Sequence, residues 1–269
     1  MRFIDTHCHL DFDELKESLP QHLTEAQAQG IGQWVVPGVT LEQCHTLPVF
    51  AQQHPGVHIA FGLHPYFMAQ HSATDMSDLA ALAHQHRAQL VAIGECGIDA
   101  IVEEIDAQQH LFIEHIALAN ALGLPLIVHH RKSHHLLANA FKQCPPQYGG
   151  VIHAFSGSLQ DAQSYLKLGF KLGVGGTISY PRAAKTRTTL AQVPLDALVL
   201  ETDAPSMPLA GYQGQPNVPK RMVEVFAHLC DIRKEPAQQL AHALYSSSAA
   251  LFGSDVSLPS VSARALSAR

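Results

Sequence analysis

The residues best suited to chemistry in this sequence are histidines and carboxylates that lie at the ends of short apolar segments. His7 and His9 follow the apolar start of the chain, and Glu95 ends a later apolar segment. The chain holds 19 histidines in 269 residues, so an H-x-H pair alone carries little weight. The context of His7 and His9 adds weight, because residues two apart in a strand point to the same face and can reach one metal ion.

Three more side chains of the metal-binding type occupy equivalent places further along the chain. His129 ends an apolar segment, His153 lies within the next one, and Asp203 follows the last. Asp203 has an alternative role as a helix N-cap before Pro205. Imidazole nitrogens and carboxylate oxygens together suit Zn²⁺, Mn²⁺ or similar ions.

The number of these candidate ligands predicts two metal ions. Six protein ligands exceed what one catalytic zinc ion uses, because such a site keeps one position open. Glu95 can bridge two ions about 3.5–4 Å apart, and such a pair lowers the pKa of a shared water toward about 7. Asp203 can bind a metal and orient or deprotonate that water.

The segments that must position these side chains alternate between strand and helix patterns. Eight short apolar segments are predicted strands: 2–7, 32–37, 57–63, 90–95, 125–129, 151–155, 170–174 and 197–201. Eight predicted helices alternate with them: 19–29, 41–54, 75–87, 104–122, 133–143, 159–168, 181–192 and 219–230. The clearest is 104–122, where apolar residues recur every three to four positions.

This alternation predicts one domain of the α/β class, a single (β/α)8 TIM barrel over residues 1–252 with an extra C-terminal helix at 236–251. A doubly wound sheet is the alternative, but it usually carries a glycine-rich turn after its first strand, where this chain has Thr6-His7-Cys8-His9. Active sites of TIM barrels lie at the carboxyl ends of the strands, where the candidate ligands fall. Residues 253–269 are predicted to form a loose tail.

Composition narrows the class of protein. Hydrophobic residues make up 46% and charged residues 15% of the chain, which supports a large core and argues against intrinsic disorder. No apolar run approaches the roughly 18 residues of a membrane helix, and the N-terminus lacks a signal-peptide pattern. Five scattered cysteines indicate reduced thiols. We therefore expect a cytoplasmic monomer with no membrane partner, and nothing here indicates a protein partner.

Six segments, in order along the chain, resemble the TatD-type metal-dependent hydrolases of the amidohydrolase superfamily. They are I-D-T-H-C-H-L at 4–10, G-L-H-P at 62–65, I-G-E-C-G-I-D at 93–99, V-H-H-R at 128–131, H-A-F-S-G at 153–157 and E-T-D-A-P at 201–205. The resemblance implies a (β/α)8 fold and two divalent ions, Zn²⁺, Mn²⁺ or Mg²⁺. It also implies hydrolysis of phosphodiester bonds in a nucleic acid or a small substrate, often as a 3′-5′ exonuclease acting on DNA.

The same resemblance divides the ligands between the ions. The first ion would be held by His7, His9, Glu95 and Asp203. The second would be held by Glu95, His129 and His153. The family pattern H-x-R aligns His129 as the ligand, and a register shifted by one residue makes it His130 instead.

The resemblance also assigns substrate contacts. His64 would contact or polarise the scissile phosphate, with a turn role before Pro65 as its alternative, and Arg131 would bind phosphate through its guanidinium. Two departures from the family pattern concern the substrate. Ala100 stands where the family usually has an aromatic residue, and Pro216–Pro219 lacks both charges of the usual Arg-Asn-Glu-Pro. Both loops are expected to line the substrate mouth.

Charge is distributed unevenly along the chain. Residues 1–130 hold 3 basic and 15 acidic residues, whereas residues 131–269 hold 14 and 8. This excludes a globally basic nucleic-acid binder but allows a local basic surface for an anionic substrate. Seven basic residues are expected to rim the active-site face or begin its helices: Arg131, Lys132, Arg182, Lys185, Arg187, Lys220 and Arg221. Six loop aromatics, for which packing is favoured over base stacking, are Phe12, Tyr66, Phe67, Phe155, Tyr180 and Tyr212.

The leading interpretation is a two-metal phosphodiesterase in which Asp203, Glu95 and His64 take part in catalysis. One alternative is an amide, ester or lactone hydrolase on the same scaffold. Related barrels often bridge their ions with a modified lysine, but no lysine lies between Lys16 and Lys132, which favours the TatD type. A second alternative, a metal-binding interaction protein without turnover, would be favoured by loss of a ligand, and none is missing.

Overall fold

Eight parallel strands form a nearly closed barrel in the computed structural model, which describes residues 1–253. The strands pair in chain order from β1 to β8. They are β1 (Phe3–Asp5), β2 (Ile31–Pro37), β3 (Val57–Phe61), β4 (Leu90–Asp99), β5 (Leu126–Arg131), β6 (Gly150–Ile152), β7 (Phe170–Val174) and β8 (Leu198–Leu200). Hydrogen bonds bring the first and last strands together, because the amide of Thr6 donates to the carbonyl of Leu200 at 3.0 Å.

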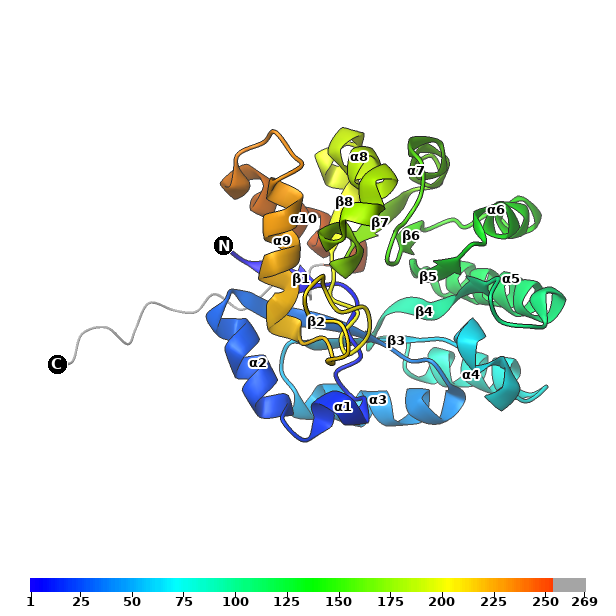
Figure 1. Ribbon diagram of the computed structural model, residues 1–269. Helices are drawn as coiled ribbons and strands as arrows, with labels where there is room; N and C mark the ends of the chain where they lie inside the picture. Colours follow the sequence, from blue (N-terminus) through cyan, green and yellow to red (C-terminus); the bar gives the residue numbers. More distant parts are fainter. Residues whose placement is uncertain (254–269) are drawn as a thin grey trace.

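Helices surround this barrel on its outside (Figure 1). They are α1 (Asp13–Lys16), α2 (Leu19–Ala28), α3 (Leu41–Gln53), α4 (Asp75–Gln85), α5 (Ile105–Leu122), α6 (His134–Gln143), α7 (Leu159–Leu166), α8 (Ala184–Gln192), α9 (Met222–Cys230) and α10 (Ala237–Phe252). Short 3-10 turns are η1 (Pro65–Gln70), η2 (Gly176–Ser179), η3 (Pro181–Ala183), η4 (Leu195–Ala197) and η5 (Pro219–Arg221). None of the helices within residues 1–253 is long and apolar enough to cross a membrane.

Two apolar clusters follow from the alternation of side chains along each strand. In β2, Trp34 and Val36 pack in the large cluster between strands and helices, whereas Val35 belongs to a second cluster. This second cluster takes single residues from seven strands and fills the barrel interior. Phe252 of α10 packs against it, so the C-terminal helix helps to close the barrel as the sequence predicts.

The predicted TIM barrel is confirmed, and its element boundaries differ at a few places. The sixth strand was expected to include His153 but ends at Ile152, because Ala154 turns the chain with a φ of 46°. The fourth strand runs four residues beyond Glu95, where it continues to pair with β5. Helix α1 was not predicted. Of the predicted tail, residues 254–269 lie outside the described part of the chain.

Candidate metal centre

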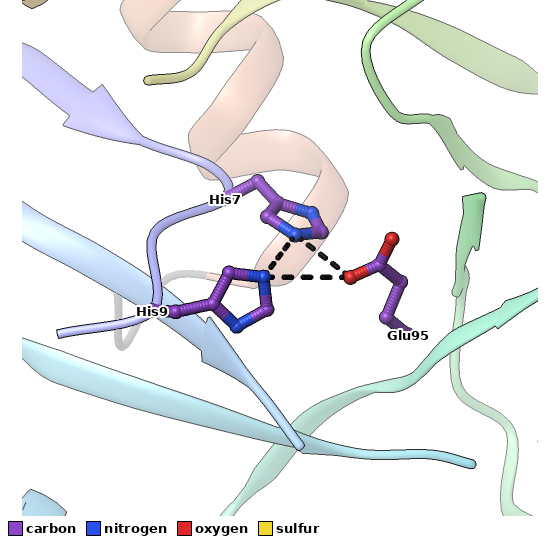
Figure 2. A group of neighbouring side chains, drawn as sticks. All are labelled: His7, His9 and Glu95. Atoms are coloured by element: carbon purple, nitrogen blue, oxygen red, sulfur yellow. Dashed lines mark hydrogen bonds and ion pairs between the residues drawn. The ribbon is translucent and has the colours of Figure 1, made fainter. Parts of the chain in front are cut away.

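The histidines of the H-x-H pair meet Glu95 at the carboxyl end of the barrel. The Nε2 atoms of His7 and His9 lie 3.2 Å apart, and Oε2 of Glu95 lies 3.1 Å and 3.5 Å from them. Figure 2 shows the three side chains pointing toward one another. Both histidines follow β1 rather than lie in it, so the loop, not strand alternation, makes their imidazoles converge.

The other carboxylate oxygen of Glu95 faces a separate set of histidines. Oε1 lies 2.9 Å from Nε2 of His64 and 3.1 Å from Nδ1 of His129. Nε2 of His153 lies further away, at 3.9 Å. One carboxylate therefore lies between two groups of nitrogen ligands, which is the arrangement of a residue that bridges two ions.

Asp203 follows β8 and completes the first group of ligands beside His7 and His9. Its Oδ1 lies 3.5 Å from Nε2 of His7, 3.6 Å from that of His9 and 3.7 Å from that of His153. Within residues 1–253 no helix begins after Asp203 before η5, so its alternative role as an N-cap is wrong. The amide of Asp203 donates to the carbonyl of His7 at 2.9 Å, which fixes the β8 loop against the loop that carries the histidines.

The site concentrates buried carboxylates without a lysine or arginine to neutralise them. Glu95 and Asp203 are almost fully buried, and within residues 1–253 all their ion pairs are with histidines. Burial raises the pKa of a carboxyl group, yet the surrounding imidazoles hold the pKa of both below the ordinary value. Burial also opposes charge on His153, but Glu201 and then Asp203 outweigh it and raise its pKa to about 10. Such a site favours positive charge, so its residues fit metal ions.

His64 is oriented as a hydrogen-bond donor toward Glu95, and it also lies close enough to Glu95 and His129 for the three to hold a metal ion. The amide of Tyr66 donates to Nδ1 of His64 at 3.0 Å, so the proton of the neutral ring must lie on Nε2, which faces Glu95. Burial lowers the pKa of His64 to about 4, which keeps the ring neutral. His115 supports this loop from α5, because its Nε2 accepts the amide of Leu63 at 3.0 Å. His71 lies 3.0 Å from the carbonyl of His64 itself.

A glycine allows the strand that carries Glu95 to lie against its neighbour. Gly97 has a φ of 142°, and a Cβ atom there would lie 2.1 Å from the carbonyl oxygen of His129. Gly97 also pairs with His129 in the β4–β5 register. Because only glycine permits this approach, the I-G-E-C-G sequence keeps His129 beside the strand of Glu95.

Three carboxylates that the sequence analysis gave no role lie directly behind the ligands. Oε1 of Glu201 lies 3.0 Å from Nδ1 of His153, and Oδ2 of Asp99 lies 3.3 Å from Nε2 of His129. Asp5 accepts the hydroxyl of Thr202 at 2.6 Å. The sequence held a signal for the roles of Asp5 and Glu201, because each directly follows apolar residues of a strand. A carboxylate buried there needs a hydrogen-bonding or charged partner. These carboxylates orient the imidazoles and the loops that present them.

Replacing Asp5 by asparagine is expected to destabilise the protein by about 1–3 kcal/mol. Oδ1 of Asp5 accepts the amide of Thr202 at 2.9 Å and Oδ2 accepts its hydroxyl, and the NH₂ group of asparagine cannot accept that hydroxyl proton. Thermal unfolding of metal-stripped protein should show a midpoint about 3–10 °C lower. Asp78→Asn, on an exposed side chain of α4, is the control. Equal midpoints for the two variants would contradict a structural role for Asp5.

Comparison with known proteins identifies the group to which this fold and site belong. The model of a family described as "TatD related DNase" matches residues 4–253. The chain belongs to the TatD family. It is 43% identical to the metal-dependent hydrolase YjjV of Escherichia coli over 93% of this chain and 98% of that one, and the crystal structure of YjjV superposes with a TM-score of 0.90. It is also 34% identical to a Cronobacter sakazakii protein named 3'-5' ssDNA/RNA exonuclease TatD, over 68% and 70% of the chains. The protein is therefore a metal-dependent hydrolase of this family.

The positions of His129 and His130 show which of these two adjacent histidines faces the other ligands. His129 faces Glu95, whereas the ring of His130 packs 4.6 Å from that of His134. His130 is buried, and burial holds its pKa well below the ordinary value. The structure thus brings His129, not His130, into the group around Glu95.

A cavity of about 570 Å³ opens over these ligands. Arg131, Phe12, Tyr66 and Phe67 line it, and Phe12 stacks on His9 with ring centroids 4.5 Å apart. The two loops that depart from the TatD pattern do not line it, contrary to expectation. Ala100 is absent from its wall, and the other loop faces inward because Asn217 is buried and donates to the carbonyl of Thr202 at 2.8 Å.

Three of the seven basic residues expected to rim the active-site face or begin its helices are held by contacts with the rest of the protein. Lys220 pairs with Glu25 at 2.9 Å, and Arg187 donates to the carbonyl of Ile178. Arg221 is buried over the ring of Tyr212. Only Arg131 and Arg182 line a cavity at this face. These residues therefore divide between the two expected placements: Arg131 and Arg182 line cavities at the active-site face, and Lys220 and Arg221 directly precede α9.

Proposed function

We propose that this protein is a binuclear, divalent-metal-dependent phosphodiesterase that trims nucleic acid from one end, in the manner of a 3′-5′ exonuclease. The observation that carries the proposal is the position of Glu95, whose two carboxylate oxygens face separate groups of histidines. The resemblance to the Cronobacter sakazakii exonuclease supports the choice of a nucleic-acid substrate. We further propose that it acts as a monomer in the cytoplasm, where its five free cysteines stay reduced.

The resemblance to the TatD family supports a division of the ligands between two ions. His7, His9, Glu95 and Asp203 would hold one ion, and Glu95, His129 and His153 the other. Zn²⁺, Mn²⁺ or Mg²⁺ bound there would lower the pKa of a water molecule and neutralise charge on the phosphate. Asp203 lies at the cavity wall, where it can accept a proton from that water.

Two further side chains would handle the substrate itself. His64 presents its Nε2 proton toward the centre of the site, so it can donate a hydrogen bond to a phosphate oxygen. The side chain of Arg131 is more than half exposed, and its Nη1 lies 3.9 Å from Oδ2 of Asp99, which leaves its other donors available. A guanidinium matches phosphate with two parallel hydrogen bonds.

The proposal is tested by stripping the protein of metal and reloading it separately with Zn²⁺, Mn²⁺ and Mg²⁺. The substrates are an end-labelled single-stranded oligonucleotide, a generic phosphodiester, and a panel of small esters and lactones. Metal-dependent shortening of the oligonucleotide from its 3′ end is the expected result. Turnover of esters or lactones with the oligonucleotide intact would replace the phosphodiesterase with the alternative hydrolase. Binding of metal without any turnover would favour an interaction protein.

Arg131→Ala is expected to raise KM for a phosphodiester about 10- to 100-fold with a smaller change in kcat. The variant loses charge-assisted hydrogen bonds worth about 1.5–3 kcal/mol that hold the substrate before and during reaction. Steady-state kinetics with the generic phosphodiester measures both constants. Lys132→Ala is the matched control, because Lys132 is the adjacent exposed cation and does not line the cavity. If both variants kept the wild-type KM, Arg131 would have no role in binding phosphate.

A further inference from the structure

A second cavity of about 450 Å³ lies beside the metal centre. It shares three lining residues with the cavity over the ligands, namely Ser156, Thr177 and Met207, so the two form one continuous trough. The remaining wall comes from the loop between β7 and α8, from Thr186 at the start of α8 and from Pro208. No carboxylate lines this second cavity, whereas the first is lined by three. The trough therefore passes from a site that needs cations to one that favours an anion.

The charge of the second cavity comes from Arg182. Its guanidinium lies over the ring of Tyr180, 4.4 Å from the centroid. Tyr180 is itself fixed, because its hydroxyl donates to the carbonyl of Pro208 at 2.7 Å. Stacking uses the flat face of a guanidinium and leaves the N–H donors at its edge available. Within residues 1–253 the guanidinium of Arg182 forms no ion pair, so those donors are free for a ligand.

The hydroxyl groups of the cavity suit the same kind of ligand. Thr177 and Ser156 lie where the two cavities meet, and Thr186 lines the far wall. Hydroxyls and guanidinium groups are the usual protein contacts of phosphate oxygens in nucleic acids. An exposed arginine alone would be weak evidence, but here it is stacked, oriented and set in a hollow continuous with the metal centre.

We propose that this second cavity is a subsite for the phosphate next to the scissile one, bound by Arg182 where it stacks on Tyr180. The inference rests on the proposed function, because it assumes a substrate with a phosphodiester at the metal centre. It adds that the protein distinguishes chains with two or more phosphates from single phosphodiesters. The preference should appear as a higher kcat/KM for an oligonucleotide than for a substrate with one phosphate.

The test is a double-mutant cycle on holoenzyme between Arg182→Gln and loss of charge on the flanking phosphate. Short single-stranded oligonucleotides carry a neutral methylphosphonate at the phosphate on the 5′ side of the 3′-terminal bond, which is the phosphate next to the one that is cleaved. Either change alone is expected to lower kcat/KM about tenfold, and both together no further than one, because each removes the same contact. Lys185→Gln is the matched control, since Lys185 is exposed on α8 and lines neither cavity.

The outcomes separate this inference from the proposed function. Independent, multiplying losses, or no loss in Arg182→Gln, would overturn the subsite while hydrolysis by the wild type still supports a phosphodiesterase. Absence of hydrolysis of any phosphodiester would overturn the proposed function. In that case the subsite is still tested by the affinity for a labelled oligonucleotide, measured by fluorescence anisotropy. About tenfold weaker binding by Arg182→Gln than by Lys185→Gln supports it, and equal binding overturns it.

Discussion

Glu95→Gln is expected to lower hydrolysis by roughly 1,000-fold or more and to reduce the number of metal ions bound per chain. Oε2 of Glu95 faces His7 at 3.1 Å, and Oε1 faces His129 at the same distance, so both ligand groups depend on one carboxylate. Glutamine keeps the size of the side chain but replaces one oxygen with an NH₂ group that cannot bind a cation. Metal at such a site supplies several kcal/mol of stabilisation to the transition state, and each 1.4 kcal/mol is about tenfold in rate.

Two measurements on the Glu95 variant separate loss of metal from loss of fold. Elemental analysis after metal loading should find fewer ions than in the wild type, and circular dichroism should find the same secondary structure. Glu114→Gln is the control, because it makes the same chemical change on an exposed residue of α5. Wild-type turnover in Glu95→Gln would refute the two-metal assignment, and full metal content with lost turnover would limit Glu95 to a role in catalysis.

The sequence predicted the barrel and the group of ligands for the same physical reason. A parallel barrel brings the carboxyl ends of all its strands to one face, so ligands far apart in the chain meet there. This is why His129 and Asp203 could be assigned to one site although nothing local connects them. The geometry of the H-x-H pair was less predictable. Its convergence depends on a loop that is held by hydrogen bonds to the β8 loop, such as that from the amide of His9 to the carbonyl of Ala204 at 2.8 Å.

The surroundings of the ligands could not be predicted in this way, because they depend on which loops turn inward. The position of residues 216–219 after β8 predicts a loop that lines the opening of the substrate cavity. In the structure Asn217 is buried and bonds to Thr202 and Met207, so this segment supports the site from behind. From the sequence, Arg187 and Arg221 were likewise expected at the surface. In the structure their guanidinium groups donate hydrogen bonds to backbone carbonyls. Composition shows charge, whereas only the tertiary contacts show which charge remains available.

Of the three carboxylates behind the ligands, Glu201 is the one whose loss should weaken metal binding most. It is fully buried, its Oε1 lies 3.0 Å from Nδ1 of His153, and it accepts the amide of Ala154 at 2.6 Å. A carboxylate on the far nitrogen of an imidazole fixes the ring and makes the other nitrogen a stronger ligand. Glu201→Gln is therefore expected to weaken metal binding about 10- to 100-fold. Isothermal titration of metal-stripped protein with Zn²⁺ measures the affinity directly, without reference to turnover.

A substitution at Gly173 tests the role of the Glu201 carboxylate independently, because it would move the carboxylate without removing it. A Cβ atom at Gly173 would lie 2.3 Å from Oε2 of Glu201, so Gly173→Ala must displace the carboxylate while leaving its charge in place. At Gly175 the Cβ atom would meet Glu201 only at 3.4 Å, which makes Gly175→Ala the matched control. Affinity for Zn²⁺ should fall in Glu201→Gln and Gly173→Ala and change little in Gly175→Ala. Wild-type affinity in both of the first two variants would show that His153 binds metal without help from this carboxylate.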